Sequence, residues 1–553
     1  MSSRLIECVP NISEGRDRAK IDAIAAVVET VEGVRLLDVD PGKATHRTVI
    51  TFVGEPEAVC EAAFRLVKKA QELIDMRGHS GEHPRFGATD VCPLVPISGV
   101  SMAECAAHAK KLGERVGKEL GIPVYLYEAA ASEEKRRNLA NNRSGEYEGL
   151  PTKLKDPAWK PDSGPAEFTD SVARSGAIAI GARNFLVAYN VNLNTTSTRR
   201  ANAIAFDIRE AGRKVKQADG SEAQVPGKLK SVKGIGWFIE EYGIAQLSLN
   251  LTDITVTPVH IAFDEACKAA DARGIRVTGS ELVGLIPKQA LLDAADFYLA
   301  RQQRSLGIPE REKMKIAVKS LGLDDLAPFD PQKKVIEYML EDANSERLVR
   351  MDLKRFSEET AGESPAPGGG SVAACVGALG AALGTMVANL SAHKRGWDDR
   401  WKEFSEWAVK GEALRNELLY LVDEDTRAFD RIMAAMGLPK GSAEEKAARK
   451  AAITEATKGA INTPLRTMQV CVESMALLNA MAENGLPASV SDAGVGALCA
   501  RAGALGGYLN VRINCAGLDD AAFKADVLAK AEALKARADA LEAEVMATTL
   551  SKV

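Results

Sequence analysis

Near residue 350 the spacing of apolar residues changes so sharply that the two parts of the chain cannot share one kind of fold. Before that point, short apolar runs rich in Val and Ile alternate with amphipathic helical segments. After it the strand signals stop, and Ala, Leu, Glu and Lys dominate between Gly and Pro residues that interrupt the pattern. This change predicts an α/β part followed by an all-α part.

The α/β part predicts two subdomains with the same order of elements. Residues 4–128 have the pattern β-α-β-β-α-β-α-β, whose first six elements match the ferredoxin-like, split βαβ arrangement. A polar connection covers residues 129–176, and a strand over residues 177–193 then begins a second, similar series. We expect two facing sheets with a ligand groove between them. The expected boundaries are residues 1–178 and 179–303 for the subdomains, 304–350 for a charged, partly helical linker, and 351–553 for a helical bundle.

Residues 371–391 contain no charged side chain and are about as long as a membrane-spanning helix. Ala and Gly supply most of this segment, and it lacks the aromatic residues that are typical of membrane interfaces. We therefore expect the central helix of a bundle and no membrane span. The helices of that bundle are expected near residues 351–361, 370–392, 398–435, 443–482, 489–515 and 520–549.

The composition is that of an ordinary cytoplasmic protein. The 553 residues have a formal net charge of −5, and no long basic stretch predicts nucleic-acid binding. The nine Cys include no Cys-x-x-Cys pair, which favours reduced thiols over a disulfide framework. An acidic residue near the start stands where a signal peptide would be apolar, so no targeting segment is expected.

The densest cluster of candidate catalytic side chains runs from Arg77 to Arg85 and includes His79, Glu82 and His83. Histidine suits general acid–base catalysis, and arginine suits binding of a carboxylate. The spacing His-x-x-Glu-His also matches an inverted zinc-hydrolase motif, but that motif requires a helix. Gly and Pro residues in the segment favour a loop, so we expect a catalytic or binding loop. Exposed loop histidines and a metal site are the alternatives.

Four other groups of polar or Gly residues are candidates for a site. A Gly-rich turn before a helix offers free N–H groups to an anion, or simply allows a crowded helix start. Two carboxylates in a predicted helix point in different directions, and a buried one is costly unless it is paired or used. A solvated acidic face is the alternative. The groups are Gly368–Ser371, Asp423 with Asp425, Asn510 with Asn514, and Asp38, Asp40, Thr45, His46 and Arg47 after the second strand.

Long segments of the chain resemble the formiminotransferase–cyclodeaminase family, and the resemblance spans nearly its whole length. The resemblance implies transfer of the formimino group from N-formimino-L-glutamate to N5 of tetrahydrofolate. It also implies ring closure of 5-formiminotetrahydrofolate to 5,10-methenyltetrahydrofolate, with release of ammonia. The matching segments are Glu7–Gly15, Leu37–Asp40, Gly81–Pro93, Gly181–Phe185, Gly234–Trp237 and Ala366–Ala374.

The resemblance assigns roles to individual residues. It implies that His83 is the transferase base, with Asp40 near it. It implies that Asp423 is the catalytic residue of the cyclodeaminase, with Asp425 as the alternative. Arg residues are available for the glutamate carboxylates of both substrates. The expected substrate- and folate-binding residues are Arg85, Gly164, Pro165, Phe168, Arg183, Gly368, Gly369, Gly370 and Ser371.

The expected co-substrate is tetrahydrofolate in a polyglutamylated form, and no metal is expected. The expected partners are N-formimino-L-glutamate, folate and further copies of the chain, because the resemblance implies a homo-oligomer built from dimers. Two departures are visible: His46 replaces an Asn of vertebrate members, and residues 216–225 resemble a surface insertion. Two alternatives stay open. One half alone is active, for example a helical methenyltetrahydrofolate cyclohydrolase, or the protein binds folate without catalysis.

Overall fold

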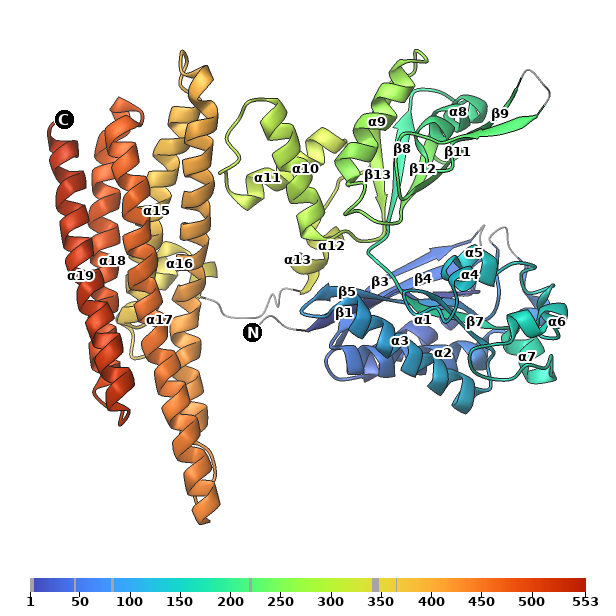
Figure 1. Ribbon diagram of the computed structural model, residues 1–553, viewed down its shortest axis with the longest axis horizontal. Helices are drawn as coiled ribbons and strands as arrows, with labels where there is room; N and C mark the ends of the chain where they lie inside the picture. The colour runs from blue at the N-terminus through green and yellow to red at the C-terminus, as the bar shows by residue number, and fades with distance from the viewer. Residues whose placement is uncertain (1–3, 44–45, 81–83, 218–220, 341–347, 365) are drawn as a thin grey trace. The chain divides into compact units, whose positions relative to one another are not determined.

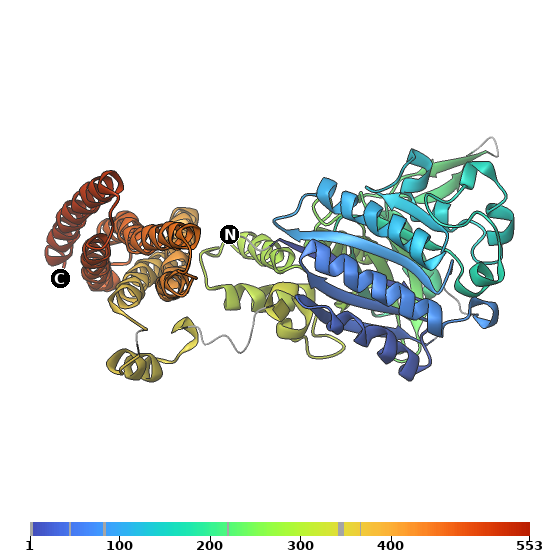
Figure 2. The same cartoon turned by 90° about the horizontal axis from the view of Figure 1, so that it is seen from below.

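The structure is a computed structural model that describes residues 4–43, 46–80, 84–217, 221–340, 348–364 and 366–553. It divides into two compact units, Met1–Leu291 with Leu321–Glu341, and Leu292–Ser320 with Asp342–Val553. Within the described ranges, all strands belong to the first unit, and the second unit is built of helices (Figures 1 and 2). The expected division into an α/β part and an all-α part is confirmed.

The first sheet has seven strands. Strand β4 pairs with β3 on one side and with β1 and β2 on the other, β5 follows, and β7 lies between β5 and β6. All pairings are antiparallel except those of β7, which runs parallel to β5 and β6. The bounds are β1 (Leu5–Cys8), β2 (Asn11–Ile12), β3 (Val34–Gly42), β4 (Arg47–Gly54), β5 (Thr89–Ser98), β6 (Val124–Glu128) and β7 (Ile178–Ala182).

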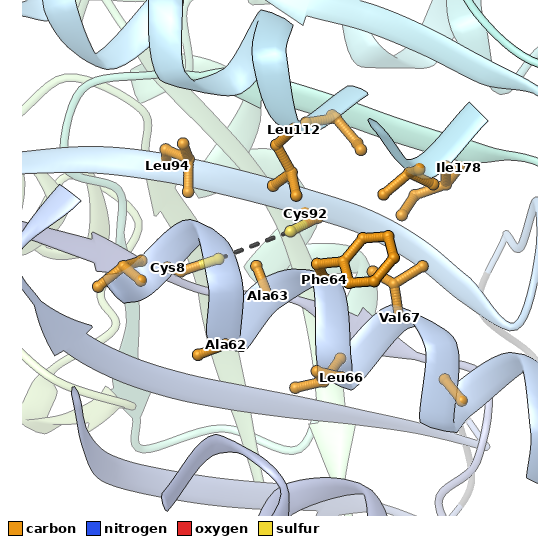
Figure 3. Close-up of a cluster of buried hydrophobic side chains, with 14 of the residues drawn as sticks. Cys8, Ala62, Ala63, Phe64, Leu66, Val67, Cys92, Leu94, Leu112 and Ile178 are labelled. Atoms are coloured by element: carbon orange, nitrogen blue, oxygen red, sulfur yellow. Dashed lines mark hydrogen bonds between the residues drawn. The ribbon is translucent and has the colours of Figure 1, made fainter. Parts of the chain in front are cut away.

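Helices α1 (Arg18–Ala26), α2 (Pro56–Leu73) and α3 (Met102–Arg115) cover one face of this sheet (Figure 1). Apolar residues of the helices pack with Ile6 and Cys8 of β1 into one core. Figure 3 shows the centre of that core, where the Sγ atoms of Cys8 and Cys92 lie 3.6 Å apart. All nine cysteines are free thiols. Because side chains alternate along a strand, Glu7 is directed to the opposite face of the sheet.

The polar connection between residues 129 and 176 contains four short α-helices. It packs against the first sheet through a small apolar cluster that includes Phe86, Tyr125 and Leu150. The long connection is therefore ordered and belongs to the first sheet's side of the unit. Its helices are α4 (Glu134–Arg137), α5 (Leu139–Asn142), α6 (Leu150–Lys153) and α7 (Asp170–Ser175).

The second sheet has four antiparallel strands in the order β11-β12-β8-β13. Strands β3, β4, β1 and β5 of the first sheet have the same relative order, so the repeated series of elements produces repeated topology. The bounds are β8 (Val187–Leu193), α8 (Thr198–Ile208), β11 (Val232–Ile239), β12 (Ile244–Leu251), α9 (Val259–Asp271), β13 (Val277–Val283) and α10 (Lys288–Arg301). The expected insertion is a separate hairpin of β9 (Arg213–Lys216) and β10 (Glu222–Val225).

The single strand expected over residues 177–193 is wrong. The segment forms two strands in different sheets, β7 in the first and β8 in the second. The chain thus leaves the first sheet after Ala182, several residues beyond the expected boundary at residue 178. An apolar run shows that a strand forms, but its pairing partner is set by contacts distant in sequence.

Each of the six helices expected after residue 350 is present. The expected linker also contains helices, α11 before residue 322 and two short ones after residue 330. The bounds are α11 (Glu310–Leu321), α12 (Pro331–Lys334), α13 (Ile336–Leu340), α14 (Leu353–Ala361), α15 (Gly369–Ala392), α16 (Trp401–Met436), α17 (Ala443–Asn484), α18 (Val490–Cys515) and α19 (Ala521–Leu550).

Helix α15 passes along the middle of the second unit, in contact with α16, α17 and α18. It is the one helix, within the described ranges, that is long and apolar enough to cross a membrane, with a mean hydropathy of 1.8. Of its most apolar stretch, 61% is buried inside the unit. A Cβ added to Gly380 would lie 2.7 Å from the carbonyl oxygen of Gly496, so these glycines allow α15 and α18 to approach closely.

Candidate active sites

A cavity of about 380 Å³ in the first unit is lined by residues of both sheets. The second sheet contributes one row of neighbouring residues across its four strands, namely Lys233, Asn250, Ala188 and Val283. The first sheet contributes the face that its helices leave uncovered, with a mixture of apolar walls and charged side chains. The lining residues from that sheet include Glu7, Val9, Asn11, Asp38, Asp40, Arg47, Val91, Pro93 and Tyr127.

Glu7 lies in the floor of this cavity. Its side chain belongs to a residue that is only 2% exposed. Burial raises the pKa of Glu7 to about 7, against the opposing charge of Arg183. Arg183 follows β7, lines the same cavity, and its backbone N–H donates to the carbonyl of Leu94. The cavity therefore holds a carboxyl that exchanges a proton near neutral pH.

Asp38 and Asp40 lie on β3 and line the cavity as expected. Burial raises the pKa of Asp38, Lys334 opposes the shift, and the charge of Asp40 adds to it. Two carboxylates on one side of the cavity leave that wall acidic, which favours a cationic or donor-rich part of a ligand.

Arg47 and Arg143 share one buried carboxylate. Asp90 is fully buried and accepts a hydrogen bond of 2.5 Å from Nη1 of Arg47 and a short one from Nη2 of Arg143. Arg47 also donates from Nε to Oδ1 of Asn11 at 3.0 Å. One carboxylate cannot neutralise two guanidinium groups, so this end of the cavity retains positive charge suited to a ligand carboxylate.

His46 and His79 form a stacked pair next to Arg47, with ring centroids 4.2 Å apart. The Nε2 atom of His79 donates to the carbonyl of His46 at 3.0 Å, while Nδ1 accepts from Arg85. Burial lowers the pKa of His79, in agreement with this neutral arrangement. Both ring nitrogens of His46 instead face acceptors, the carbonyl of Ser80 at 2.9 Å and Glu14 at 3.1 Å. A doubly protonated His46 satisfies both.

The carboxylate of Glu14 fixes the backbone that follows it, because it accepts hydrogen bonds from the N–H groups of Arg16 and Asp17. Burial alone raises the pKa of a carboxyl, but amide hydrogen bonds from Asp17 and Arg16, together with His46, outweigh it and lower the pKa of Glu14. The φ angle of His46 is 52°, in the left-handed region where Asn is also well tolerated. Backbone geometry thus accounts for an Asn or a His at this position.

The expected transferase base, His83, lies outside the described residues, as do Glu82 and Thr45. The neighbouring Arg85 is described, and protein groups occupy its guanidinium. It donates to both carboxylate oxygens of Glu148, to the carbonyl of His79 at 3.0 Å and to His79 Nδ1 at 3.2 Å. These contacts give Arg85 a role in positioning the loop and do not support the expected binding of a substrate carboxylate.

The expected folate-contacting stretch lies beside α3 and does not line the cavity. Gly164 has a φ of 85°, and a Cβ there would lie 2.2 Å from the carbonyl oxygen of Ile122. Phe168 is 38% exposed, and its ring centroid lies 6.4 Å from that of Tyr147. The contacts of Gly164 are structural, whereas Phe168 and the adjacent Pro165 remain accessible.

A second cavity, of about 170 Å³, lies in the helical unit around the start of α15. The Gly-rich turn forms one wall, with Gly368, Gly369 and Gly370, and residues of α16, α17 and α18 form the others. A Cβ on Gly370 would lie 2.2 Å from an Oδ atom of Asp425, so only glycine fits there. The expected Gly-rich site thus contains a carboxyl group.

Asp425, and not Asp423, lines this second cavity. The Oδ2 atom of Asp425 accepts a hydrogen bond of 3.1 Å from the Ser371 hydroxyl. Burial raises the pKa of Asp425, against the hydrogen bonds from Ser371. Asp423 is buried on another side of α16, where Oδ1 accepts from the backbone N–H of Leu348 at 2.7 Å. Its contact is structural, and the preference for Asp423 over Asp425 is not supported.

Asn510 and Asn514 lie one helical turn apart on α18 and both line the second cavity. Each donates its amide to a backbone carbonyl, Asn510 to Gly506 at 2.8 Å and Asn514 to Ala460 at 2.9 Å. Each side-chain carbonyl can then accept from a ligand. Within the ranges that the structure describes, no group of three or more His, Cys, Asp or Glu residues could hold a metal ion.

Sequence reasoning missed Glu7, Asp90 and Arg143. A carboxyl within the otherwise apolar strand β1 is a visible signal for Glu7, because a solvated residue is not expected in the middle of a central strand. Asp90 gives the same signal, because it is a carboxyl near the start of the otherwise mostly apolar strand β5. Arg143 lies in the polar connection, where nothing in the sequence distinguishes it from its charged neighbours.

Comparison with known proteins agrees with this division into two sites. Residues 5–183 match the N-terminal subdomain of the formiminotransferase domain, residues 188–341 match the formiminotransferase domain, and residues 352–533 match the formiminotransferase-cyclodeaminase model. The change between the first two matches coincides with the passage from β7 to β8.

Whole-length and half-length relatives are both found. A formimidoyltransferase-cyclodeaminase of Gallus gallus is 45% identical over 95% of each chain. A glutamate formimidoyltransferase of Streptococcus pyogenes is 42% identical over 54% of this chain and 94% of its own. A methenyltetrahydrofolate cyclohydrolase of Methylorubrum extorquens is 43% identical over 36% of this chain and 97% of its own. The chain belongs to the formiminotransferase-cyclodeaminase family.

Proposed function

We propose that the protein is a bifunctional folate enzyme with one active site in each unit. The first unit transfers the formimino group from N-formimino-L-glutamate to N5 of tetrahydrofolate and releases glutamate. The second closes 5-formiminotetrahydrofolate to 5,10-methenyltetrahydrofolate and releases ammonia. The observation that carries this proposal is the presence of two separate cavities, each with buried carboxyl groups, in a chain related along 95% of its length to a bifunctional enzyme.

In the transferase unit, N5 of tetrahydrofolate attacks the formimino carbon and loses a proton as it does so. His83 is the proposed base for that proton. Of the described residues on either side of it, Ser80 accepts a hydrogen bond from His46, the neighbour of Arg47, and Arg85 donates to Glu148. Arg47 and Arg143 at that end are the proposed partners of a glutamate carboxylate, together with Arg183. Asp40 lies on β3, which pairs with the strand of Arg47, and contributes the acidic wall beside them.

In the helical unit, Asp425 is the proposed acid–base residue. Its raised pKa favours the protonated acid, which can donate a proton to the amine that departs as ammonia. Gly368, Gly369 and Gly370 at the start of α15 line the same cavity, and the free N–H groups of a helix start suit an anionic part of the folate. Asn510 and Asn514 provide further polar contacts.

One coupled assay tests both halves. Purified protein is mixed with N-formimino-L-glutamate and tetrahydrofolate; released glutamate reports transfer, and methenyltetrahydrofolate and ammonia report ring closure. Asp425→Asn is expected to stop ring closure and to leave formimino transfer intact. Asp423→Asn is the matched control on the same helix, expected to affect ring closure much less. Equal loss from both variants, or loss from Asp423→Asn alone, would refute the assignment of Asp425.

A second candidate activity for the helical unit is hydrolysis of methenyltetrahydrofolate. It is favoured by the relative of that name, which matches this unit at 43% identity. Ring closure with release of ammonia and hydrolysis of the closed ring use the same folate site but different small molecules. Incubation of the protein with methenyltetrahydrofolate alone separates the two, because only a cyclohydrolase consumes it without ammonia.

Further features belong to the same proposal. The folate is polyglutamylated, with Pro165 and Phe168 as accessible contacts beyond the cavity. The protein is cytoplasmic, needs no metal, binds neither nucleic acid nor a membrane, and forms a homo-oligomer built from dimers. Both sheets are ferredoxin-like subdomains, a description supported by their shared strand order. Size measurement of the native protein and metal analysis of the purified protein test the oligomer and the metal.

A further inference from the structure

Glu7 is a buried carboxyl group in the floor of the first cavity. Its neighbours in register, Val53 on β4 and Val95 on β5, are buried and apolar. Among the residues that the structure describes, none donates a hydrogen bond to the Glu7 carboxyl. A buried carboxyl without donors is unfavourable, because it loses its contacts with water and gains none in exchange. A ligand that supplies donors in the cavity removes this penalty.

The side chains around Glu7 suit a flat ligand. Val9, two residues after Glu7 on the same chain segment, and Pro93 on the adjacent strand β5 line the cavity, and Tyr127 is buried on the same side of the sheet. The nearest positive group that acts on Glu7 is Arg183. Apolar walls with one carboxyl at the floor are typical of sites that bind a planar heterocycle through a pair of N–H donors.

The position of Glu7 along the cavity separates it from the reacting end. Asn11, which contacts Arg47, lies four residues further along the same chain segment. At roughly 3.3 Å per residue, this places the two ends about 13 Å apart. The stacked His46 and His79 adjoin the Arg47 end. A ligand that spans the cavity thus has one edge at Glu7 and its other side near His46 and His79.

We propose that Glu7 binds the 2-amino-4-oxopyrimidine edge of tetrahydrofolate, with its two carboxylate oxygens accepting from the N3–H and the 2-amino group. This inference rests on the proposed function of the first unit. N5 lies on the ring of the pterin remote from that edge. Holding the edge at Glu7 therefore directs N5 toward the end of the cavity where Arg47 and Arg143 lie, next to the stacked His46 and His79.

Another substrate group with the same kind of donor pair is the formimino group itself, an amidine. Its carbon must lie beside N5 and the base, at the Arg47 end. Glu7 lies too far from that end to hold the amidine and leave room for the pterin between them. The geometry points to the pterin edge. Steady-state kinetics can distinguish the pterin edge from the amidine, because the first belongs to tetrahydrofolate and the second to N-formimino-L-glutamate.

The test is steady-state kinetics of formimino transfer by the full-length protein and its Glu7→Gln variant. The expected result is an increase of roughly 10-fold or more in KM for tetrahydrofolate, with KM for N-formimino-L-glutamate changed less than about 2-fold. Glu7→Asp, which keeps the carboxylate but withdraws it, is expected to be intermediate. Glu57→Gln, an exposed carboxyl on α2, is the matched control and is expected to behave like the unaltered protein.

A folate analogue sharpens the assignment. The 2-desamino-2-methyl analogue of tetrahydrofolate lacks one of the two donors, so the unaltered protein should use it with kcat/KM at least about 10-fold lower than tetrahydrofolate. The Glu7→Gln variant should discriminate much less between the two. Unchanged discrimination, or an increase confined to KM for N-formimino-L-glutamate, overturns the inference. Absence of transfer by the unaltered protein refutes the proposed function instead, whereas transfer with unchanged constants in the variant refutes only the role of Glu7.

Discussion

Replacing Glu7 by Gln should stabilise the first unit more at about pH 8 than at about pH 5.5. The residue is 2% exposed, and burial raises its pKa from 4.5 to about 7. Because the folded-state pKa lies above the unfolded value, the folded protein binds more protons between these two values. Stability is therefore greatest below the unfolded pKa and is lost as the pH rises from about 4.5 through about 7.

The magnitude follows from the size of the shift. Each pKa unit corresponds to about 1.4 kcal/mol, so complete ionisation of Glu7 in the unliganded protein costs about 3 kcal/mol of unfolding free energy. About 2 kcal/mol of that loss falls between pH 5.5 and pH 8. Glutamine has nearly the shape of the protonated acid and does not ionise, so the variant avoids this pH-dependent loss. Any constant cost of burying the amide is the same at both pH values.

The assay is thermal unfolding of the full-length protein and the variant at the two pH values without folate. Hydrogen exchange in peptides from β1, β4 and β5 identifies the transition of the first unit. The melting temperature of the variant relative to the unaltered protein should rise by roughly 3 °C between about pH 5.5 and about pH 8. Glu29→Gln, an exposed residue of the same unit, is the control. An equal difference at both pH values, or a reversed one, refutes the reasoning.

Three further predictions concern the two sites. Gly370→Ala places a methyl group 2.2 Å from Asp425, so ring closure should fall by roughly 100-fold in an assay with supplied 5-formiminotetrahydrofolate, with formimino transfer retained. Asp90→Ala leaves two half-buried guanidinium groups without their partner and should destabilise the first unit by about 3 kcal/mol, measured by denaturant unfolding. His83→Ala should abolish formimino transfer, with ring closure as the internal control; residual transfer above about 10% would exclude its role as the base.

The helical part shows how far a sequence pattern reaches. The six expected helices correspond to those observed because their lengths and breaks are local properties, set by Gly and Pro residues and by helix-forming stretches. The order of strands and helices in the α/β part is equally local. The Gly-rich turn was identifiable because only a few residue types can start a helix in so confined a space.

Pairing and orientation were not predictable in the same way. The strand that the pattern placed over residues 177–193 is divided between two sheets, because the partner of each half comes from a distant part of the chain. Arg85 was expected to bind substrate, but Glu148, 63 residues away in sequence, occupies its guanidinium. No local pattern records such a contact.

The amino-acid sequence by itself determined the two kinds of domain, the order of their elements and the family to which the chain belongs, because periodicity and long motifs are carried by neighbouring residues. Only the tertiary structure decided which carboxyl groups face the cavities. Asp423 and Asp425 differ by two positions on one helix, and Glu7 alternates with core residues on one strand. On α16, Asp423 packs against Leu348, so Asp425 is the carboxyl left for a ligand. On β1, the residues on either side of Glu7 pack into the core with α2, so Glu7 is the side chain left facing the cavity.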